Sequence, residues 1–255
     1  MPDDLDEFAR RLDRPEYPRS STYDPAWLLE NMMGPHPLWL AESLSGLVPF
    51  APGDRVLDLG CGTALTSVFL AREFDVRVEA VDLWIDAAEN LDRVTRAGLA
   101  DRVHPVHADA MALPFDAASF DTIVSVDAYH YFGTAPGALD TVVRVLKPGG
   151  RIAVAVPGLA REVTWPDALG PWWEPGFETF HSAHWWASLW RSSATVRIDH
   201  ADAVPDGHRD WLAWGEIADD WAVARGREPY RREVEMLRAD TDRLLGVVSL
   251  VATKT

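Results

Sequence analysis

Apolar and polar positions change their period along the chain, and this change predicts the elements. Between residues 55 and 156, short apolar runs recur between segments whose apolar residues have helical spacing, so strands alternate with helices. This alternation is typical of βαβ units, which right-handed crossovers join into a parallel sheet. The predicted strands are Arg55–Leu59, Val76–Val81, Val103–Ala108, Phe120–Val126 and Arg151–Val156, with helices over residues 64–73, 85–97 and 136–146 between them.

The segments on either side complete the same sheet. Residues 157–180 are rich in Pro, Trp and Gly, and so long an irregular stretch predicts a loop or lid with a function. The N-terminal residues predict an irregular arm or a short helix. The remaining expected elements are helices at 26–33, 37–48, 184–192, 209–224 and 229–243, and strands at Thr195–Ala201 and Leu244–Ala252. We therefore expect an α/β fold with a doubly wound, mostly parallel, seven-stranded Rossmann-like sheet, helices on both faces, an N-terminal helical arm and a Trp-rich lid.

Charge and composition exclude several classes of partner. The formal net charge is −16, and such a charge repels the phosphate backbone of DNA or RNA. The single cysteine, Cys61, excludes an internal disulfide and a cysteine-rich zinc site. No apolar run approaches the length of about 20 residues that spans a bilayer, and the charged N-terminus lacks the apolar core of a signal peptide. We expect a cytoplasmic protein with no nucleic-acid, membrane or metal partner, and a homodimer remains open.

The strongest chemical signal is the glycine-rich turn after the first strand. In Val56–Thr63 (VLDLGCGT), Gly60 and Gly62 let the backbone approach a ligand, and the following helix points its free N–H groups at that ligand. Leu65 stands where a dinucleotide-binding turn has its third glycine. Asp58 repels a pyrophosphate but can receive an ammonium group. The turn therefore predicts a ligand with an amino-acid end.

Two further acids follow the next strands. Asp82 ends the second strand, 20 residues after Gly62, where a carboxylate can accept both hydroxyls of a ribose. Asp109 follows the third strand and can accept from an exocyclic amine, while the N–H of Ala110 can reach a ring nitrogen. Asp109 can equally be a turn former or a helix cap. Three acids at neighbouring strand ends are more specific than any one of them, because ligands of open parallel sheets bind there.

These residues resemble class I S-adenosylmethionine-dependent methyltransferases over about residues 50–157. The resemblance lies in VLDLGCGT, the strand-end Asp82, HADAMALPF, FDTIVSVDAYHYF and LKPGGRIAVAVPG, which occur in the expected order. It implies an enzyme whose cofactor is S-adenosylmethionine, converted to S-adenosylhomocysteine. It also implies a single domain with an arm over residues 1–50, a cofactor-binding core over 51–157 and a substrate side over 158–255. Some features are also similar to cyclopropane-synthase-like members.

The resemblance carries over to individual residues. Gly60, Gly62 and Asp127 are expected near the methionine part, and Asp82 on the ribose. Asp109 and Ala110 are expected on the adenine. The segments YPRSS and MGP look like N-terminal elements that close over the cofactor in small-molecule members. The full set of expected cofactor-binding residues is Tyr17, Ser20, Gly34, Asp58, Gly60, Gly62, Asp82, Leu83, Asp109, Ala110 and Asp127.

Three residues are candidates for the chemistry itself: His130, Tyr129 and His181. His130 follows the fourth strand, near the expected position of the transferring methyl group, and has the pKa range of a general base; a structural histidine is an equal alternative. Tyr129, like Tyr131, can instead line the pocket. His181 lies beside a tryptophan pair and can face the substrate entrance. A metal site there lacks a defined third ligand.

The acceptor is predicted to be a small apolar or aromatic metabolite, methylated on O, N or C. The basis is 12 tryptophans, six of them between residues 165 and 190, most of which we expect to serve packing. Cyclopropane-synthase-like methylene transfer is an alternative, which the acidic charge disfavours for a phospholipid substrate. A non-methylating cyclase or cofactor-binding regulator on the same fold is another, because a fold does not determine a function. A dehydrogenase is disfavoured by Leu65 and Asp58.

Overall fold

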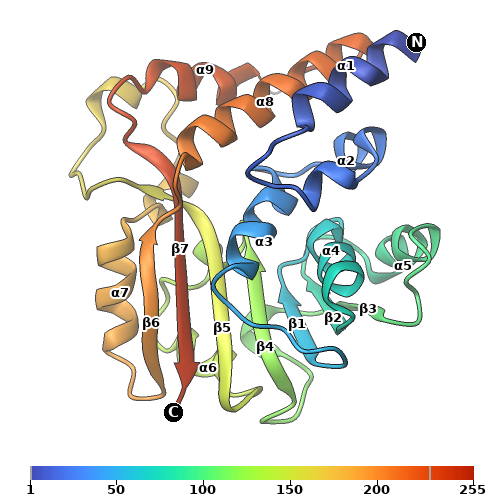
Figure 1. Ribbon diagram of the computed structural model, residues 1–255. Helices are drawn as coiled ribbons and strands as arrows, with labels where there is room; N and C mark the ends of the chain where they lie inside the picture. The colour runs from blue at the N-terminus through green and yellow to red at the C-terminus, as the bar shows by residue number, and fades with distance from the viewer. Residues whose placement is uncertain (1, 230) are drawn as a thin grey trace.

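The computed structural model describes residues 2–229 and 231–255, which include one seven-stranded sheet in the order β3-β2-β1-β4-β5-β7-β6. The first five strands along the chain are parallel, and β7 runs antiparallel between β5 and β6 (Figure 1). This confirms the predicted doubly wound, mostly parallel sheet. The strands are β1 Arg55–Leu59, β2 Arg77–Asp82, β3 Val103–His107, β4 Phe120–Val126, β5 Leu146–Leu159, β6 Val196–Ala203 and β7 Leu245–Lys254.

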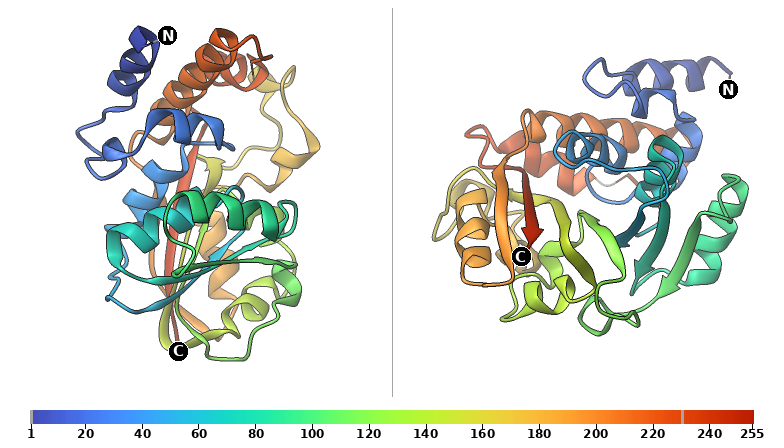
Figure 2. Two further views of the ribbon diagram at one scale, coloured as in Figure 1. Left: turned by 90° about the vertical axis from the view of Figure 1, so that its right-hand side faces the viewer. Right: turned by 60° about the horizontal axis from the view of Figure 1, so that its bottom comes forward.

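Helices cover both faces of this sheet (Figure 2). One apolar core joins α3, α4, α5 and α8 to the sheet, and the other joins α6 and α7 to the opposite face. The helices are α1 Pro2–Leu12, α2 Pro25–Glu30, α3 Pro37–Ser45, α4 Leu65–Phe74, α5 Ala87–Arg96, α6 Ala138–Val143, α7 Ala183–Arg191, α8 Gly207–Ala224 and α9 Arg231–Ala239. None of the helices in the described part of the chain is long and apolar enough to cross a bilayer.

Two elements differ from the sequence prediction. β5 begins at Leu146, where the end of a helix and a turn were expected. The strand register shifts there: Phe120 pairs with Leu146, but Thr122 pairs with Arg151, so the intervening residues form an irregularity within the strand. Gly149 supports it with φ +76°. At the N-terminus, α1 is a helix of 11 residues, which settles the choice between an arm and a helix.

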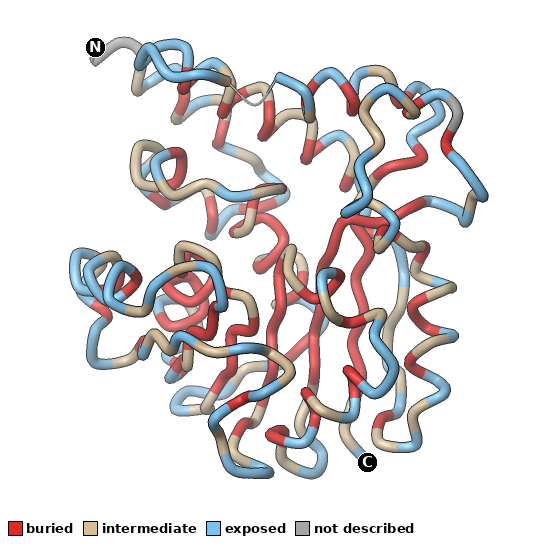
Figure 3. The backbone as a smooth tube through the Cα atoms, turned by 180° about the vertical axis from the view of Figure 1, so that it is seen from behind, coloured by how far each residue is buried: buried red, intermediate tan, exposed pale blue. Residues whose placement is uncertain are grey.

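Side-chain alternation along β1 determines which residues reach each core. Val56 belongs to the core under α4, whereas Leu57 belongs to the core on the α6 and α7 face. Buried positions follow the strands through the centre of the molecule (Figure 3). By the same alternation Asp58 points toward α4, so its side chain lies under the helix rather than in the loop above the strand.

A second layer lies over one end of the sheet. α1, α8 and α9 lie together there in two perpendicular views (Figures 1 and 2). Aromatic packing holds the arm to α8: Phe8 lies edge-on to Trp221 at 5.1 Å between ring centroids. Tyr17 stacks on Trp39 at 5.5 Å, and Trp39 lies edge-on to Trp214 of α8 at 6.4 Å. These contacts place the arm and the last helices above the loops that follow the parallel strands.

Candidate functional site

A cavity of about 460 Å³ opens where the strand order reverses between β1 and β4. Open α/β sheets bind ligands at this switch point, outside the carboxyl ends of the strands. We call it the main cavity. Its lining includes residues from the ends of β1, β2 and β4, from the arm and from α9. They are Met33, Gly34, Pro37, Leu59, Gly60, Cys61, Gly62, Thr63, Leu65, Thr66, Val81, Asp82, Leu83, Trp84, Ala108, Asp109, Ala110, Val126, Asp127, Ala128, Tyr131, Phe132 and Glu233.

The glycine turn forms the floor of the main cavity. The N–H groups of Gly60 and Cys61 both donate to the carbonyl of Val81, at 2.8 and 2.9 Å, which ties the turn to β2. Gly60 has φ +77°, and a Cβ built there would lie 2.2 Å from the Cβ of Ala128. Only glycine satisfies both conditions, so the backbone stays open to a ligand.

Thr63 lies just before α4 but does not cap this helix. The N-cap is Ala64, in a left-handed conformation with φ 63° and no side-chain cap. Thr63 instead donates its hydroxyl to the carbonyl of Asn31 at 2.5 Å. The threonine therefore fastens the arm to the glycine turn.

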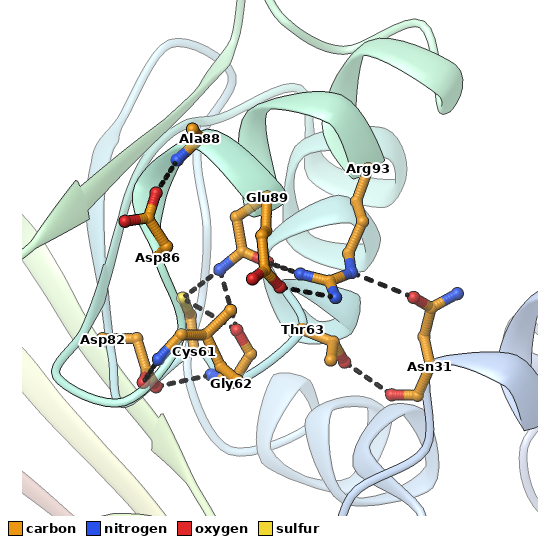
Figure 4. A network of polar contacts seen from close by, with 11 residues as sticks. Asn31, Cys61, Gly62, Thr63, Asp82, Asp86, Ala88, Glu89 and Arg93 are labelled. Carbon is orange, nitrogen blue, oxygen red and sulfur yellow. Dashed lines mark hydrogen bonds and ion pairs between the residues drawn. The ribbon is translucent and has the colours of Figure 1, made fainter.

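Asp82 organises the loop after β2 (Figure 4). Its Oδ2 accepts from the N–H of Gly62 at 2.8 Å. Its Oδ1 accepts from the N–H groups of Trp84 and Ile85 at 2.8 and 2.9 Å. A carboxylate has about four lone-pair sites, so these three bonds leave one. Asp82 thus keeps one acceptor position toward the cavity rather than the two that the sequence suggested.

Leu83, Asp109 and Ala110 line the same cavity beside Asp82. Asp109 also acts as a helix cap: its Oδ1 accepts from the N–H of Met111 at 2.8 Å and begins a short 3-10 helix at Ala110. The sequence left a cap and a ligand contact as alternatives. Because the cap uses one oxygen of the carboxylate, the other remains available for a donor.

Asp58 is fully buried and does not line the main cavity. Its Oδ2 accepts from the Ser67 hydroxyl of α4 at 2.6 Å, and its Oδ1 has no hydrogen-bond partner among the described residues. Burial raises the pKa of Asp58 to about 7, and the charge of Asp82 adds to this rise. The sequence placed Asp58 next to a ligand, but strand alternation turns it into the protein.

The arm contributes Gly34 to the cavity wall, held there by the indole N–H of Trp214, which donates to its carbonyl at 2.9 Å. Tyr17 and Ser20 lie elsewhere. Tyr17 donates its hydroxyl to Asp210 at 2.7 Å, and Ser20 donates to Glu42 at 2.6 Å. Of the three arm residues expected at the cofactor, only Gly34 reaches the main cavity.

Three ionisable groups meet at the arm side of the main cavity: Asp127, Tyr131 and Glu233. Burial raises the pKa of Asp127 well above its usual range, and the charge of Glu233 adds to this shift. Burial, with the charges of Asp127 and Glu233, raises the pKa of Tyr131 to about 12. Asp127 has φ 54°, so the chain turns sharply as it leaves β4.

Glu233 was not expected at the site. It belongs to a charged run, residues 225–238, and such a run is typical of a solvated helical face. The signal was present in its spacing: Met236 and Leu237 follow at three and four positions and are buried, so Glu233 shares their inward side of α9. The indole N–H of Trp211 donates to its carboxylate, and burial raises the pKa of Glu233.

The residues predicted to act in the chemistry do not line the main cavity. His130 is buried against Tyr131 and Phe180, and burial lowers its pKa to about 4. Tyr129 is fully buried beside Trp190 of α7. His181 stacks on a tryptophan ring and contacts Glu162 at 3.1 Å. Among the described residues, no three potential metal ligands converge.

The tryptophan-rich region divides into two parts. Trp186 and Trp190 are fully buried on α7 and pack on the sheet. Trp172 and Trp173 instead pack with Phe177 in a smaller cluster toward α9. Trp172 lines a second cavity beside the main one, and Glu233 lines both. Of the two parts, only the one with Trp172 and Trp173 lies near the main cavity.

The fold is the Rossmann-like α/β fold of solved class I methyltransferases. Residues 56–150 match the family model described as a methyltransferase domain. The matched residues include the glycine turn, Asp82, Asp109 and Asp127. The recognition made from the sequence motifs is therefore confirmed.

Curated relatives match about half of the chain. The chain is 36% identical to the 27-O-demethylrifamycin SV methyltransferase of Amycolatopsis mediterranei, over 45% of this chain and 43% of that protein. It is 39% identical to the demethylmenaquinone methyltransferase of Clavibacter sepedonicus, over 53% of each. The chain thus spans about half the length of the curated relatives it matches.

A solved structure extends the likeness to the whole fold. The geranyl diphosphate C-methyltransferase of Streptomyces coelicolor, in complex with Mg²⁺, geranyl diphosphate and S-adenosylhomocysteine, aligns with a TM-score of 0.65 and 18% identity. The alignment covers 99% of this chain and 98% of that one. At this identity the likeness concerns the fold, including the helical layer above the sheet.

Proposed function

We propose that this chain is an S-adenosylmethionine-dependent methyltransferase of a small molecule. The observation that carries the proposal is the main cavity, where a glycine turn and three strand-end acids, Asp82, Asp109 and Asp127, meet at the switch point of the sheet. An acidic lining suits a ligand with a sulfonium and an ammonium charge, and it repels a diphosphate. The net charge of −16 makes a nucleic-acid acceptor unfavourable.

The residues fit the cofactor as follows. The left-handed Gly60 and Gly62 keep the floor free of Cβ atoms for the methionine part. The open acceptor site of Asp82 receives a ribose hydroxyl, with Leu83 beside it. Asp109 and the Ala110 backbone hold the adenine. Residues 51–157 would then be the cofactor core, with residues 1–50 and 158–255 enclosing it.

When bound, S-adenosylmethionine supplies an electrophilic methyl group on a sulfonium. The task of the protein is to align the acceptor with it and to exclude water. Asp127, Tyr131 and the arm around Gly34 close the methionine end of the cavity. The acceptor side is apolar and partly open: Trp84 is 64% exposed and lies edge-on to Tyr131 at 4.9 Å. Such exposed aromatic pairs favour an apolar or aromatic acceptor.

The test is an incubation of the purified protein with S-adenosylmethionine carrying an isotopically labelled methyl group and a metabolite extract. The proposal predicts S-adenosylhomocysteine and a labelled small-molecule product by mass spectrometry. Tight cofactor binding without S-adenosylhomocysteine in any extract would contradict methyl transfer and favour a cyclase or regulator. Label in cyclopropane lipids alone would contradict the choice of acceptor.

A further inference from the structure

Glu233 lies between the main cavity and the two cavities beside it. It lines the main cavity, a smaller one beside Met32 and Ala218, and the second cavity, which Trp172 and Phe177 also line. Its carboxylate is held by the indole N–H of Trp211, so its position is fixed from the α8 side. A molecule that enters from the second cavity toward Asp127 therefore meets Glu233.

The ionisable groups around this meeting point are acids. Asp127 and Glu233 interact electrostatically across the cavity, and Asp219 on α8 also repels a charge on Glu233. Among the described residues that line the main cavity there is no Lys, Arg or His. Two cations of α9, Arg231 and Arg232, line the second cavity but not the main one, and Arg232 is paired with Glu174 at 3.1 Å. An anionic acceptor would find no partner at the reacting end.

We infer that Glu233 is the acceptor-side catalytic carboxylate and that the acceptor is an uncharged, flat, apolar molecule with a phenolic or enolic hydroxyl. This inference rests on the proposed function and specifies its substrate class. The ring system lies against the aromatic wall of Trp84, Tyr131 and Phe132. The hydroxyl donates a hydrogen bond to the Glu233 carboxylate. The site discriminates against acceptors that carry a phosphate, sulfonate or carboxylate.

Transfer of the methyl group requires only the acceptor hydroxyl, the sulfonium of the cofactor and the Glu233 carboxylate. The hydroxyl oxygen forms a C–O bond to the methyl carbon as the C–S bond breaks, and the pair of electrons of that bond stays on the sulfur, which becomes a neutral thioether. The hydroxyl proton passes to Glu233 and then to water. Burial raises the pKa of Glu233, which makes its carboxylate a stronger base than an exposed glutamate.

The test compares two probes that differ in one charge: 2,3-dihydroxynaphthalene and its 6-sulfonate. Their Kd values are measured by tryptophan fluorescence on the full chain saturated with S-adenosylhomocysteine. We expect the diol to bind at least tenfold more tightly than the sulfonate. Equal or tighter binding of the sulfonate, or no binding of the diol, would overturn the inference.

Glu233→Gln then tests the residue, with Glu235→Gln as the matched control because Glu235 is exposed on the same helix. We expect Glu233→Gln to lower kcat for O-methylation of the diol by about 100-fold, the effect of losing a general base. Its Kd for S-adenosylhomocysteine should stay within twofold, which excludes misfolding. Equal kcat in the two variants, or no methylation of a bound diol by wild type, would contradict the role of Glu233.

The cofactor measurements separate this inference from the proposed function. Protein that binds S-adenosylmethionine and methylates other acceptors, but prefers anionic ones, would refute the substrate class alone. Protein that binds neither S-adenosylmethionine nor S-adenosylhomocysteine would refute the proposed function itself.

Discussion

Gly34 lies directly on the carboxylate of Asp127: a Cβ built on this glycine would be 1.8 Å from Oδ2 of the aspartate. The two residues come from the arm and from the tip of β4, 93 positions apart, and both have left-handed backbone conformations. This contact closes the main cavity from above. The arm therefore belongs to the binding site, although only Gly34 of its three predicted cofactor residues reaches it.

Gly34→Ala should weaken binding of S-adenosylmethionine at least tenfold. Its Cβ would push the arm away from Asp127 or strain the backbone at φ +54°. Gly98→Ala is the matched control, because Gly98 has φ +71° but nothing lies within 4 Å of the added Cβ. Calorimetric titration of both variants separates the clash from the strain. Equal affinities would show that the arm does not form part of the site.

Asp82→Asn should lose both cofactor affinity and stability. An amide offers one accepting oxygen, so at least one of the three N–H donors to Asp82 loses its partner, at about 1–3 kcal/mol. Asp86→Asn is the control: Asp86 accepts from the N–H of Ala88 at 2.7 Å, and asparagine caps a helix as well. Urea unfolding and calorimetry measure the two effects. A stable Asp82→Asn variant with unchanged affinity would contradict both roles.

Asp58 should make the protein less stable as the pH rises. Its pKa is raised from 3.8 to about 7 in the folded state, so the folded protein holds a proton that the unfolded chain releases. The free energy of unfolding, relative to Asp58→Asn, should therefore fall by about 1.4 kcal/mol per pH unit above pH 4. The difference should level off above about pH 7. Urea titrations between pH 5 and 8 measure it, and a constant or rising difference would contradict the burial of this charge.

The two parts of the tryptophan-rich region should respond differently to alanine. Trp172→Ala should raise the acceptor KM severalfold and leave stability nearly unchanged, because Trp172 is half-buried at the second cavity. Trp186→Ala should cost about 3–5 kcal/mol of stability, since its ring is fully buried. Steady-state kinetics and thermal unfolding measure the pair. An unchanged KM in Trp172→Ala would remove the support for an acceptor-binding lid.

Local sequence patterns predicted most of the fold because the apolar residues of each strand and helix recur with the period of that element. The bounds of β1 and β4 agree with the pattern, and the strand ends bring Asp82, Asp109 and Asp127 to one cavity as expected. The rule that ligands bind at the carboxyl ends of parallel strands predicted Asp82 and Asp109, and the family resemblance predicted Asp127.

The sequence pattern did not predict side-chain direction or contacts between residues far apart in the chain. Asp58 lies two positions before Gly60 of the turn, and the alternation of side chains along β1 places it under α4. Glu233 reaches the cavity only because α9 folds back over the sheet, about 100 residues after Asp127 in the chain. His130 follows a strand end but turns into the core against Phe180. The helical spacing of Glu233 gives its inward side of α9, but the cavity that this side faces depends on how α9 packs on the sheet.

Isothermal titration of the purified chain with S-adenosylmethionine and with S-adenosylhomocysteine measures the binding on which the proposed function depends. We expect saturable one-to-one binding of both by wild type, and a loss of at least tenfold in affinity in Gly34→Ala and Asp82→Asn. A well-folded wild-type protein that takes up neither compound would contradict it.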